Sequence, residues 1–160
     1  MLIRKAIKKD KQQLLFLIQQ FALYYDQEEI FPKTLMPFIQ SKDKEKTLAE
    51  FAKKFIEDPQ YFTFVAELDG KLVGYICGDI KEKSYRILDK EGFIEDWFVL
   101  KEQRRKGVGN ALYRALIATF RKETCNRIGV SAYYANSKAI ALYHTLGFLD
   151  YDLTLVKAIE

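Results

Sequence analysis

The residues that most clearly suggest chemistry are two glycines and three basic side chains that precede an amphipathic helix. They form the run RRKGVG, in which Arg104, Arg105 and Lys106 come just before Gly107 and Gly109. The first N–H groups of a helix have no partners within the helix, and the helix dipole adds partial positive charge there. Glycine has no Cβ, so the oxygens of an anion can approach the main chain closely. The run therefore predicts a site for phosphate groups.

Two common phosphate-binding loops are excluded by their spacing. A triphosphate loop requires GxxxxGK followed by Ser or Thr, and the chain has no such string. A dinucleotide fingerprint, GxGxxG, requires a third glycine where the chain has Leu112, and no acidic residue follows a later strand at a convincing distance. The remaining pattern is RxxGxG, which follows the strand-like run IEDWFVL and opens a helix. The alternative is a glycine-eased turn with a solvated basic face.

Length and composition predict one domain over residues 1–160 with a single hydrophobic core. The chain is 49% hydrophobic and 14% aromatic, and a chain of this length buries roughly two-thirds of its surface on folding. Its net charge of +4, from 26 basic and 22 acidic residues, is too small and too mixed to indicate nucleic-acid binding. Local basic segments are better candidates for binding small anions.

The cysteines, the histidine and the hydropathy exclude several other classes. Cys77 and Cys125 form no CxxC pair, so reduced thiols and a cytoplasmic location are expected. No metal site is predicted, because the single histidine, His144, has no clustered cysteine or histidine partner. No apolar run approaches the roughly 20 residues of a membrane span, and no apolar signal segment begins the chain.

Hydrophobic periodicity predicts an α/β (α+β) domain with the order β-α-α-β-β-β-α-β-α-β. Asp69 and Gly70 predict a tight turn between the second and third strands. Asp10 and Gln13 predict a capping box at the start of the first helix. Strands are predicted over residues 2–7, 93–100, 127–133 and 151–159, with a hairpin over 61–80. One helix is predicted after residue 10, and further helices over about 44–56, 107–122 and 136–146. Residues 26–43 are predicted to form a long loop or a broken short helix.

The order of elements and their residues together resemble the GNAT superfamily of acyl-CoA-dependent N-acyltransferases. The resemblance covers nearly the whole chain and rests on IRKAIKKD, VAELDGKLVGYI, IEDWFVLKEQRRKGVG and NSKAIALYHTLGF. It implies the GNAT fold, a central mixed and mostly antiparallel sheet flanked by helices. Arg105 stands where the family often has glycine, and Lys101 stands where many relatives have proline. Because the backbone N–H of Arg105 remains, phosphate binding is expected to survive.

The resemblance implies acetyl-CoA as the donor, with no metal. The pyrophosphate of coenzyme A would bind main-chain N–H groups of the glycine loop, and its pantetheine arm would lie beside the fourth strand. Family members commonly splay the fourth and fifth strands apart, often with a bulge, which leaves main-chain groups unpaired. Asn136 is expected both to cap the last helix and to contact coenzyme A. The expected donor-binding residues are Trp97, Phe98, Val99, Arg104, Arg105, Lys106, Gly107, Val108, Gly109, Asn110 and Asn136.

Direct attack of an amine on the acetyl thioester also needs a base, because an amine of pKa ~10.4 is almost wholly protonated at pH 7. Glu95 is the first choice, since it lies in an otherwise apolar strand beside the expected thioester. Strict alternation places Glu95 and Asp96 on opposite faces unless a bulge intervenes. Structural hydrogen bonds, or amine binding without catalysis, are the alternative roles for these carboxylates.

Tyr143 is the expected acid for the leaving thiolate, because it lies where the family places its tyrosine. The resemblance also implies that a backbone N–H of Val99 or its neighbour stabilises the thioester oxygen. Tyr143 shares an apolar helical stripe, and a tyrosine on such a stripe is usually part of the core. His144 is more consistent with a position at the rim or surface.

The acceptor is expected to be a primary amine of a small molecule or a peptide, with a weak resemblance to polyamine- and diamine-acetylating members. Carboxylates and aromatic rings at the end of the first helix suit a cation. The expected acceptor-binding residues are Tyr24, Tyr25, Glu28, Glu29 and Asp96. The family also suggests a homodimer. Two alternatives stay open: an acyl-CoA sensor without turnover, and a nucleic-acid-binding domain that only the RRK run supports.

Overall fold

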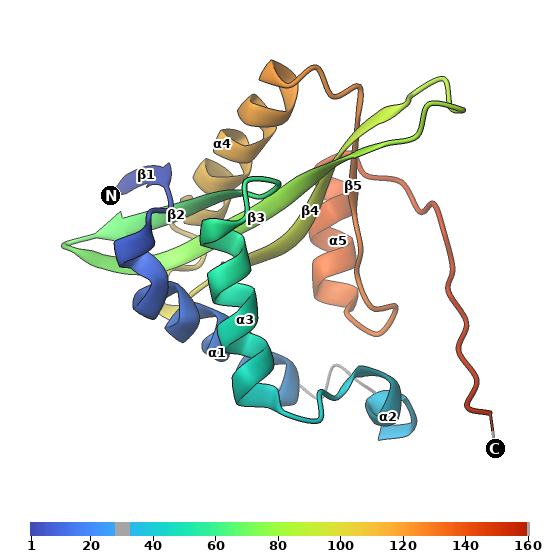
Figure 1. Ribbon diagram of the computed structural model, residues 1–160, viewed down its shortest axis with the longest axis horizontal. Coiled ribbons are helices and arrows are strands. Elements are labelled where there is room, and N and C mark those ends of the chain that lie inside the picture. Colours follow the sequence, from blue (N-terminus) through green and yellow to red (C-terminus); the bar gives the residue numbers. More distant parts are fainter. Residues whose placement is uncertain (28–32, 160) are drawn as a thin grey trace.

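The computed structural model describes residues 1–27 and 33–159 (Figure 1). Its strands are β1 (Leu2–Lys5), β2 (Phe62–Leu68), β3 (Lys71–Glu82), β4 (Lys90–Val99) and β5 (Arg127–Val130). Its α-helices are α1 (Lys11–Gln27), α2 (Met36–Ile39), α3 (Lys44–Glu57), α4 (Val108–Lys122) and α5 (Ser137–Thr145). Three short 3-10 turns are η1 (Lys8–Asp10), η2 (Lys33–Leu35) and η3 (Lys101–Gln103).

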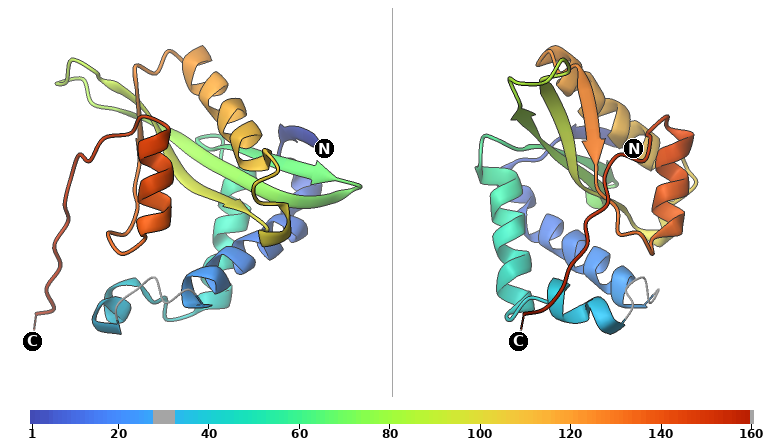
Figure 2. Two further views of the ribbon diagram at one scale, coloured as in Figure 1. Left: turned by 180° about the vertical axis from the view of Figure 1, so that it is seen from behind. Right: turned by 90° about the vertical axis from the view of Figure 1, so that its right-hand side faces the viewer.

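One five-stranded sheet, in the order β1-β2-β3-β4-β5, forms the centre of the fold (Figures 1 and 2). Neighbouring strands are antiparallel except β4 and β5, which are parallel. The turn between β2 and β3 contains Asp69 and Gly70, both with positive φ, as the sequence predicts. Helices α1 and α3 cover one face of the sheet, and α4 covers the other. The expected mixed, mostly antiparallel sheet flanked by helices is confirmed.

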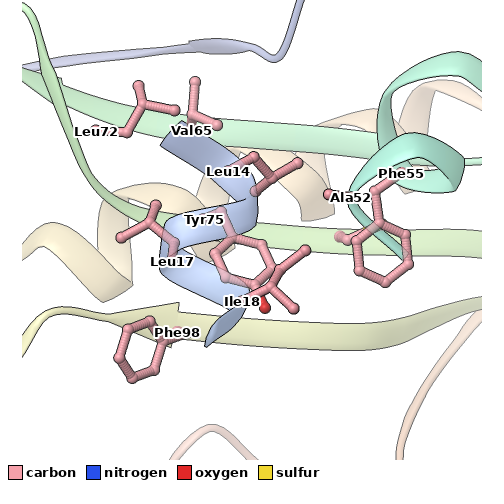
Figure 3. Close-up of a cluster of buried hydrophobic side chains, with 10 residues drawn as sticks. Leu14, Leu17, Ile18, Ala52, Phe55, Val65, Leu72, Tyr75 and Phe98 are labelled. Carbon is pink, nitrogen blue, oxygen red and sulfur yellow. The ribbon is translucent and has the colours of Figure 1, made fainter. Parts of the chain in front are cut away.

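The core under α1 and α3 is built from the apolar stripes of both helices (Figure 3). Leu14, Leu17 and Ile18 of α1 are buried together with Phe55 of α3 and Tyr75 of β3. Tyr75 is fully buried, so its hydroxyl requires a partner inside the protein. That partner connects this core to the candidate site described below.

The start of α1 is fixed by a buried ion pair, and the predicted capping box is wrong. The carboxylate of Asp10 accepts a hydrogen bond from the N–H of Ile7 at 2.8 Å and pairs with the guanidinium of Arg4. Its own N–H donates to the carbonyl of Ile7. Gln13 instead accepts a hydrogen bond from the N–H of Leu72 at 2.8 Å. Both side chains therefore hold α1 against the sheet.

The last predicted strand, over residues 151–159, is also wrong. After α5, the C-terminal arm (residues 149–159) runs away from the sheet, and within the described part of the chain no strand pairs with it (Figure 1). Its large apolar side chains are exposed, among them Leu149, Leu153 and Leu155. Their alternation is typical of a strand, but a strand needs a partner for its main-chain groups. The observed order thus lacks the final strand, whereas η2 and α2 agree with the broken short helix that was one of the two predictions for residues 26–43.

Candidate active site

The loop between η3 and α4 presents main-chain N–H groups as the sequence predicts. The first hydrogen bond of α4 runs from the N–H of Ala111 to the carbonyl of Gly107 at 3.0 Å. The N–H groups of residues 108–110 precede that bond, so no carbonyl of the helix can reach them. Gly107 is the N-cap residue, with a φ of 83°, and it provides no side-chain cap. A phosphate oxygen can take the place of that cap.

Arg105 adopts a backbone conformation that ordinarily favours glycine. Its φ is 61°, in the left-handed region, where a Cβ costs about 1–2 kcal/mol. The glycine that the GNAT family often carries at this position would remove that strain. The side chains of Arg105 and Lys106 are exposed, so both can contact an anion at the rim of the loop.

Arg104 turns away from the loop and holds the end of β4. Its Nε donates to the carbonyl of Val99 at 2.9 Å, and its guanidinium lies 4.6 Å from the centre of the Tyr24 ring. Tyr24, one of the expected acceptor residues, is therefore a packing surface for Arg104. On the other side of the loop, a Cβ added at Gly109 would lie 3.5 Å from the ring of Trp97. The loop is thus seated directly on β4.

The edge of β4 that faces β5 is open along its second half. The two strands pair only over residues 91–94 of β4 and 127–130 of β5. On the opposite edge, the N–H of Leu100 donates to a carbonyl of β3 at 3.0 Å. Main-chain groups alternate between the two edges, so those of Trp97 and Val99 point toward the β5 side. This is the strand opening that the resemblance implies.

A β-bulge at Glu95 places two adjacent carboxylates on one face of the sheet. The register of β3 and β4 pairs Ile94 and Asp96 and skips Glu95 between them. Ile94 packs with α4, whereas Asp96 and Glu95 bind Tyr75 and Lys81. Those two partners share a face of β3, because they are an even number of residues apart. The bulge therefore interrupts the strict alternation that would separate the two carboxylates.

The surroundings of Asp96 change the pKa of its carboxylate. The pKa of Asp96 is raised to about 7, and burial is the largest cause. The hydrogen bond that the Tyr75 hydroxyl donates, at 2.9 Å, lowers the pKa, whereas the charge of Glu95 raises it. The side chain keeps some exposure, so a substrate can reach it. Glu95 is also partly exposed, and it accepts a hydrogen bond from the ammonium of Lys81 at 2.8 Å. A pKa of about 7 suits Asp96 to exchange a proton near neutral pH.

Two tyrosines from distant parts of the chain lie close enough to Asp96 to interact with its charge. Burial raises the pKa of Tyr143, and the charge of Asp96 raises it further. Burial also raises the pKa of Tyr25 to about 12, and Tyr143 and Asp96 contribute. Tyr25 packs edge-on against Tyr133, with ring centres 6.3 Å apart. The end of α1, the bulge of β4 and helix α5 therefore meet around Asp96.

Tyr143 lies beside the strand opening. Its ring stacks on Trp97 with centres 6.4 Å apart and packs against Phe148 at 5.8 Å. Helix α5, which carries Tyr143, begins at the buried Asn136, whose side chain accepts a hydrogen bond from the N–H of Ala139 at 3.2 Å. This bond is the N-cap that the sequence predicts. The Tyr143 ring is thus held against the side chain of Trp97 in β4.

The structure brings Asp96, Tyr143 and Tyr25 together, and Tyr24 lies beside Tyr25 but packs against Arg104. Glu28 and Glu29 lie outside the described residues. Sequence interpretation missed Tyr75 and Lys81, which bind the two carboxylates. The period-two pattern of β3 does place both on one face, but the sequence gives no register with β4. His144 pairs with Asp150 at the surface, in agreement with its expected position.

Other kinds of site are not found in residues 1–27 and 33–159. This part of the chain has no group of three or more His, Cys, Asp or Glu side chains that could hold a metal ion. None of its helices is both long and apolar enough to cross a membrane. A shallow hollow of about 350 Å³ on α3 contains none of the expected site residues; its lining is Glu50, Lys53, Lys54, Glu57 and Asp58. The opening beside β4 is therefore the candidate site.

Solved structures with the same fold include one in complex with a coenzyme A analog. A mutant of the BH1408 protein from Bacillus halodurans matches with a TM-score of 0.81 at 19% identity, covering 100% of both chains. AAC(6')-Iy, in complex with the bisubstrate analog CoA-S-monomethyl-acetylneamine, matches with a TM-score of 0.69 at 17% identity, covering 99% of this chain and 97% of that one. At these identities the likeness shows the fold alone.

Sequence comparison places the chain in a family. An N-alpha-acetyltransferase of Sulfurisphaera tokodaii is 39% identical over 94 residues, which are 54% of this chain and 56% of that protein. The chain spans about half the length of the curated relatives it matches. The model of the Acetyltransferase (GNAT) family matches residues 22–148, which contain the open strand, the glycine loop and Tyr143. The chain therefore belongs to the Acetyltransferase (GNAT) family.

Proposed function

We propose that the chain is an acyl-CoA-dependent N-acetyltransferase that moves the acetyl group of acetyl-CoA to a primary amine by direct attack. Membership of the GNAT family supports acetyl transfer to an amine. The observation that carries the proposal is the open edge of β4, where an anion-binding loop, a carboxylate with a pKa of about 7 and a tyrosine converge. No other part of the described chain combines these three features.

Acetyl-CoA, as the donor substrate, fits the groups along this opening. The N–H groups of residues 108–110 and the exposed charges of Arg105 and Lys106 suit its pyrophosphate. The outward main-chain groups of Trp97 suit an amide of its pantetheine arm, whereas the carbonyl of Val99 already accepts a hydrogen bond from Arg104. Phe98, which was expected among the donor-binding residues, directs its main-chain groups toward β3 and its ring into the core. The proposal therefore gives Phe98 a packing role.

The proposal assigns the base to Asp96. An acceptor amine of pKa ~10.4 arrives as an ammonium and must lose a proton before it attacks. Asp96 can take that proton, directly or through a water, because its pKa of about 7 matches neutral conditions. The prediction that Glu95 is the base stays a prediction. The ion pair between Glu95 and Lys81 supports a role for Glu95 other than that of the base. Replacing Asp96 and Glu95 separately shows which carboxylate is the base.

The remaining steps involve the opposite side of the opening. A bond forms between the amine nitrogen and the acyl carbon, and the carbon–sulfur bond breaks. The N–H of Val99 points into the opening and suits the negative charge that develops on the acyl oxygen. Tyr143 donates its proton to the departing sulfur and is reprotonated by the second proton that the amide nitrogen loses, directly or through water, while Asp96 releases the first proton to solvent. Burial raises the pKa of Tyr143, which keeps the hydroxyl protonated until the sulfur leaves.

The acceptor in this proposal carries a primary amine on a small molecule, such as a polyamine, or on a peptide. The carboxylates of Asp96 and Glu95, together with the ring of Tyr25, suit a cation. Peptide N-termini are worth testing because sequence relatives are named N-alpha-acetyltransferase. Aminoglycosides are worth testing because one structural neighbour is in complex with an acetylneamine analog.

Two further properties belong to the proposal, a homodimer and a cytoplasmic location. The C-terminal arm exposes alternating apolar side chains, which a second copy can cover by pairing with its own sheet edge. Cys77 and Cys125 are free thiols, which suits a reducing compartment. Light scattering of the purified chain, with and without residues 149–160, tests the dimer.

Release of free CoA thiol is the test of the proposed activity. The purified chain is incubated with acetyl-CoA and, in turn, polyamines, aminoglycosides, amino acids and peptides with free N-termini. We expect turnover with at least one class, and we expect CoA to raise the melting temperature. Binding of CoA without thiol release for any amine would favour the sensor and overturn the enzyme. Failure to bind CoA at millimolar concentration would overturn both.

A further inference from the structure

The ammonium of Lys81 lies in a cage of two carboxylates and one aromatic ring. Its Nζ is 2.8 Å from Oε1 of Glu95 and 3.7 Å from Oδ1 of Asp79. It also lies 3.7 Å from the centre of the Phe93 ring. Carboxylates combined with an aromatic face are the surroundings that proteins use to bind an ammonium group. We call Asp79, Glu95 and Phe93 the ammonium cage.

The cage is incompletely satisfied by Lys81. Oδ1 of Asp79 is buried and, within the described part of the chain, accepts no hydrogen bond. Its distance from the Lys81 ammonium is an ion-pair distance and too long for a hydrogen bond. Burial raises the pKa of Asp79, and Lys81 lowers it. A second donor, or a better placed ammonium, would improve the cage.

The cage adjoins the position where the acceptor reacts. Because of the bulge, Glu95 and the proposed base Asp96 are consecutive residues on the same face of β4. Lys81 is 38% exposed, so its flexible side chain can move into solvent without breaking the core. An acceptor that presents one amine to Asp96 can therefore extend a second ammonium into the cage.

We propose that the ammonium cage is a binding subsite for a second ammonium group of the acceptor, and that Lys81 is a specificity-determining residue that competes for it. This inference rests on the proposed acetyl transfer at Asp96. Each acceptor with two ammonium groups must displace Lys81, whereas an acceptor with one does not. Lys81 thereby sets the preference between dicationic and monocationic amines.

The test compares 1,5-diaminopentane with pentylamine, which differ only in the second ammonium group. In Lys81→Ala the cage has no internal occupant, and we expect the ratio of kcat/KM for the diamine over the monoamine to rise about tenfold. Lys71→Ala removes the same charge from the exposed start of β3 and should leave the ratio unchanged. Glu95→Gln should lower the ratio.

A merely structural ion pair would give a different result. Lys81→Ala would then lower the melting temperature and change both acceptors equally, and an unchanged or lower ratio would overturn the proposal. Calorimetric binding of the diamine to CoA-saturated protein provides a readout that does not need turnover. Tighter diamine binding in Lys81→Ala, without thiol release from any amine, would support the cage while contradicting the proposed transfer. Equal binding in both proteins would overturn the cage.

Discussion

The donor side and the acceptor side of β4 are built in different ways. The donor side, residues 104–110 and the open edge of β4, offers mainly main-chain N–H groups whose positions follow from local conformation. The acceptor side consists of side chains from α1, β3, β4 and α5, gathered around Asp96. The donor side therefore tolerates changes of side chain, whereas the acceptor side depends on the bulge and the register of the sheet.

The largest expected effect is on the acceptor side, where Tyr143 supplies a proton. Tyr143→Phe should lower kcat by about 10²- to 10⁴-fold, the usual contribution of a positioned acid. The Kd of CoA should stay within about twofold of the original value, because the ring remains. Tyr113→Phe is the matched control, since Tyr113 also stacks on Trp97, with centres 5.4 Å apart. Equal loss of activity in both variants would assign Tyr143 to packing.

The partly buried carboxylate of Asp96 should also lower the stability of the fold. The pKa of Asp96 is about 7 in the folded protein, above its ordinary value, so the unfolded chain loses its proton first as the pH rises. Stability attributable to Asp96 therefore falls between about pH 4 and pH 7. Asp96→Asn should raise the free energy of unfolding by about 2–4 kcal/mol at pH 8, and the gain should vanish near pH 4.

Urea unfolding at the two pH values measures this difference. Asp152→Asn, in the exposed C-terminal arm, removes the same charge and should show no such gain. A gain of equal size at both pH values would contradict the raised pKa of Asp96.

A smaller effect is expected on the donor side from the backbone of the loop. Gly107→Ala introduces a Cβ at a φ of 83°, and the strain of about 1–2 kcal/mol should weaken CoA binding about tenfold. The KM of the amine should change little. Gly147→Ala creates the same strain at a φ of 87° beyond α5. It should lower stability without changing the Kd of CoA, and equal weakening in both variants would exclude a local donor site.

The smallest expected effect distinguishes the two adjacent carboxylates. The charge of Glu95 raises the pKa of Asp96, so Glu95→Gln should lower that pKa. The ascending limb of the kcat/KM profile should then move by about half a pH unit to lower pH. Movement of the limb to higher pH would contradict the proposed coupling between the two side chains.

The donor side could be predicted from the sequence because its determinants are local. Two glycines after basic residues, a preceding strand and a following amphipathic helix predict the loop and α4, and Asn136 predicts the cap of α5. The turn at residues 69–70 is predicted in the same way, because it depends on residues a few positions apart. The mixed sheet is expected from the family resemblance, since its strands pair over long distances in the chain.

The acceptor side could not be predicted in the same way. Nothing in IEDWFV marks Glu95 as the bulged residue. Strict alternation therefore predicts the two carboxylates on opposite faces of the sheet, whereas the structure places them on the same face. Lys81 and Tyr75 require the register of β3 and β4, which forms between residues far apart in the chain. The C-terminal arm has a strand pattern, but no strand of the described residues pairs with it.

The most direct test of the account is the effect on kcat of replacing each of the two adjacent carboxylates, measured with one amine at pH 7.5. If Asp96 is the base, Asp96→Asn lowers kcat by about 10²- to 10⁴-fold, while Glu95→Gln changes it by less than about threefold. The reverse order, with Glu95→Gln inactive and Asp96→Asn active, would contradict the assignment of Asp96 as the base.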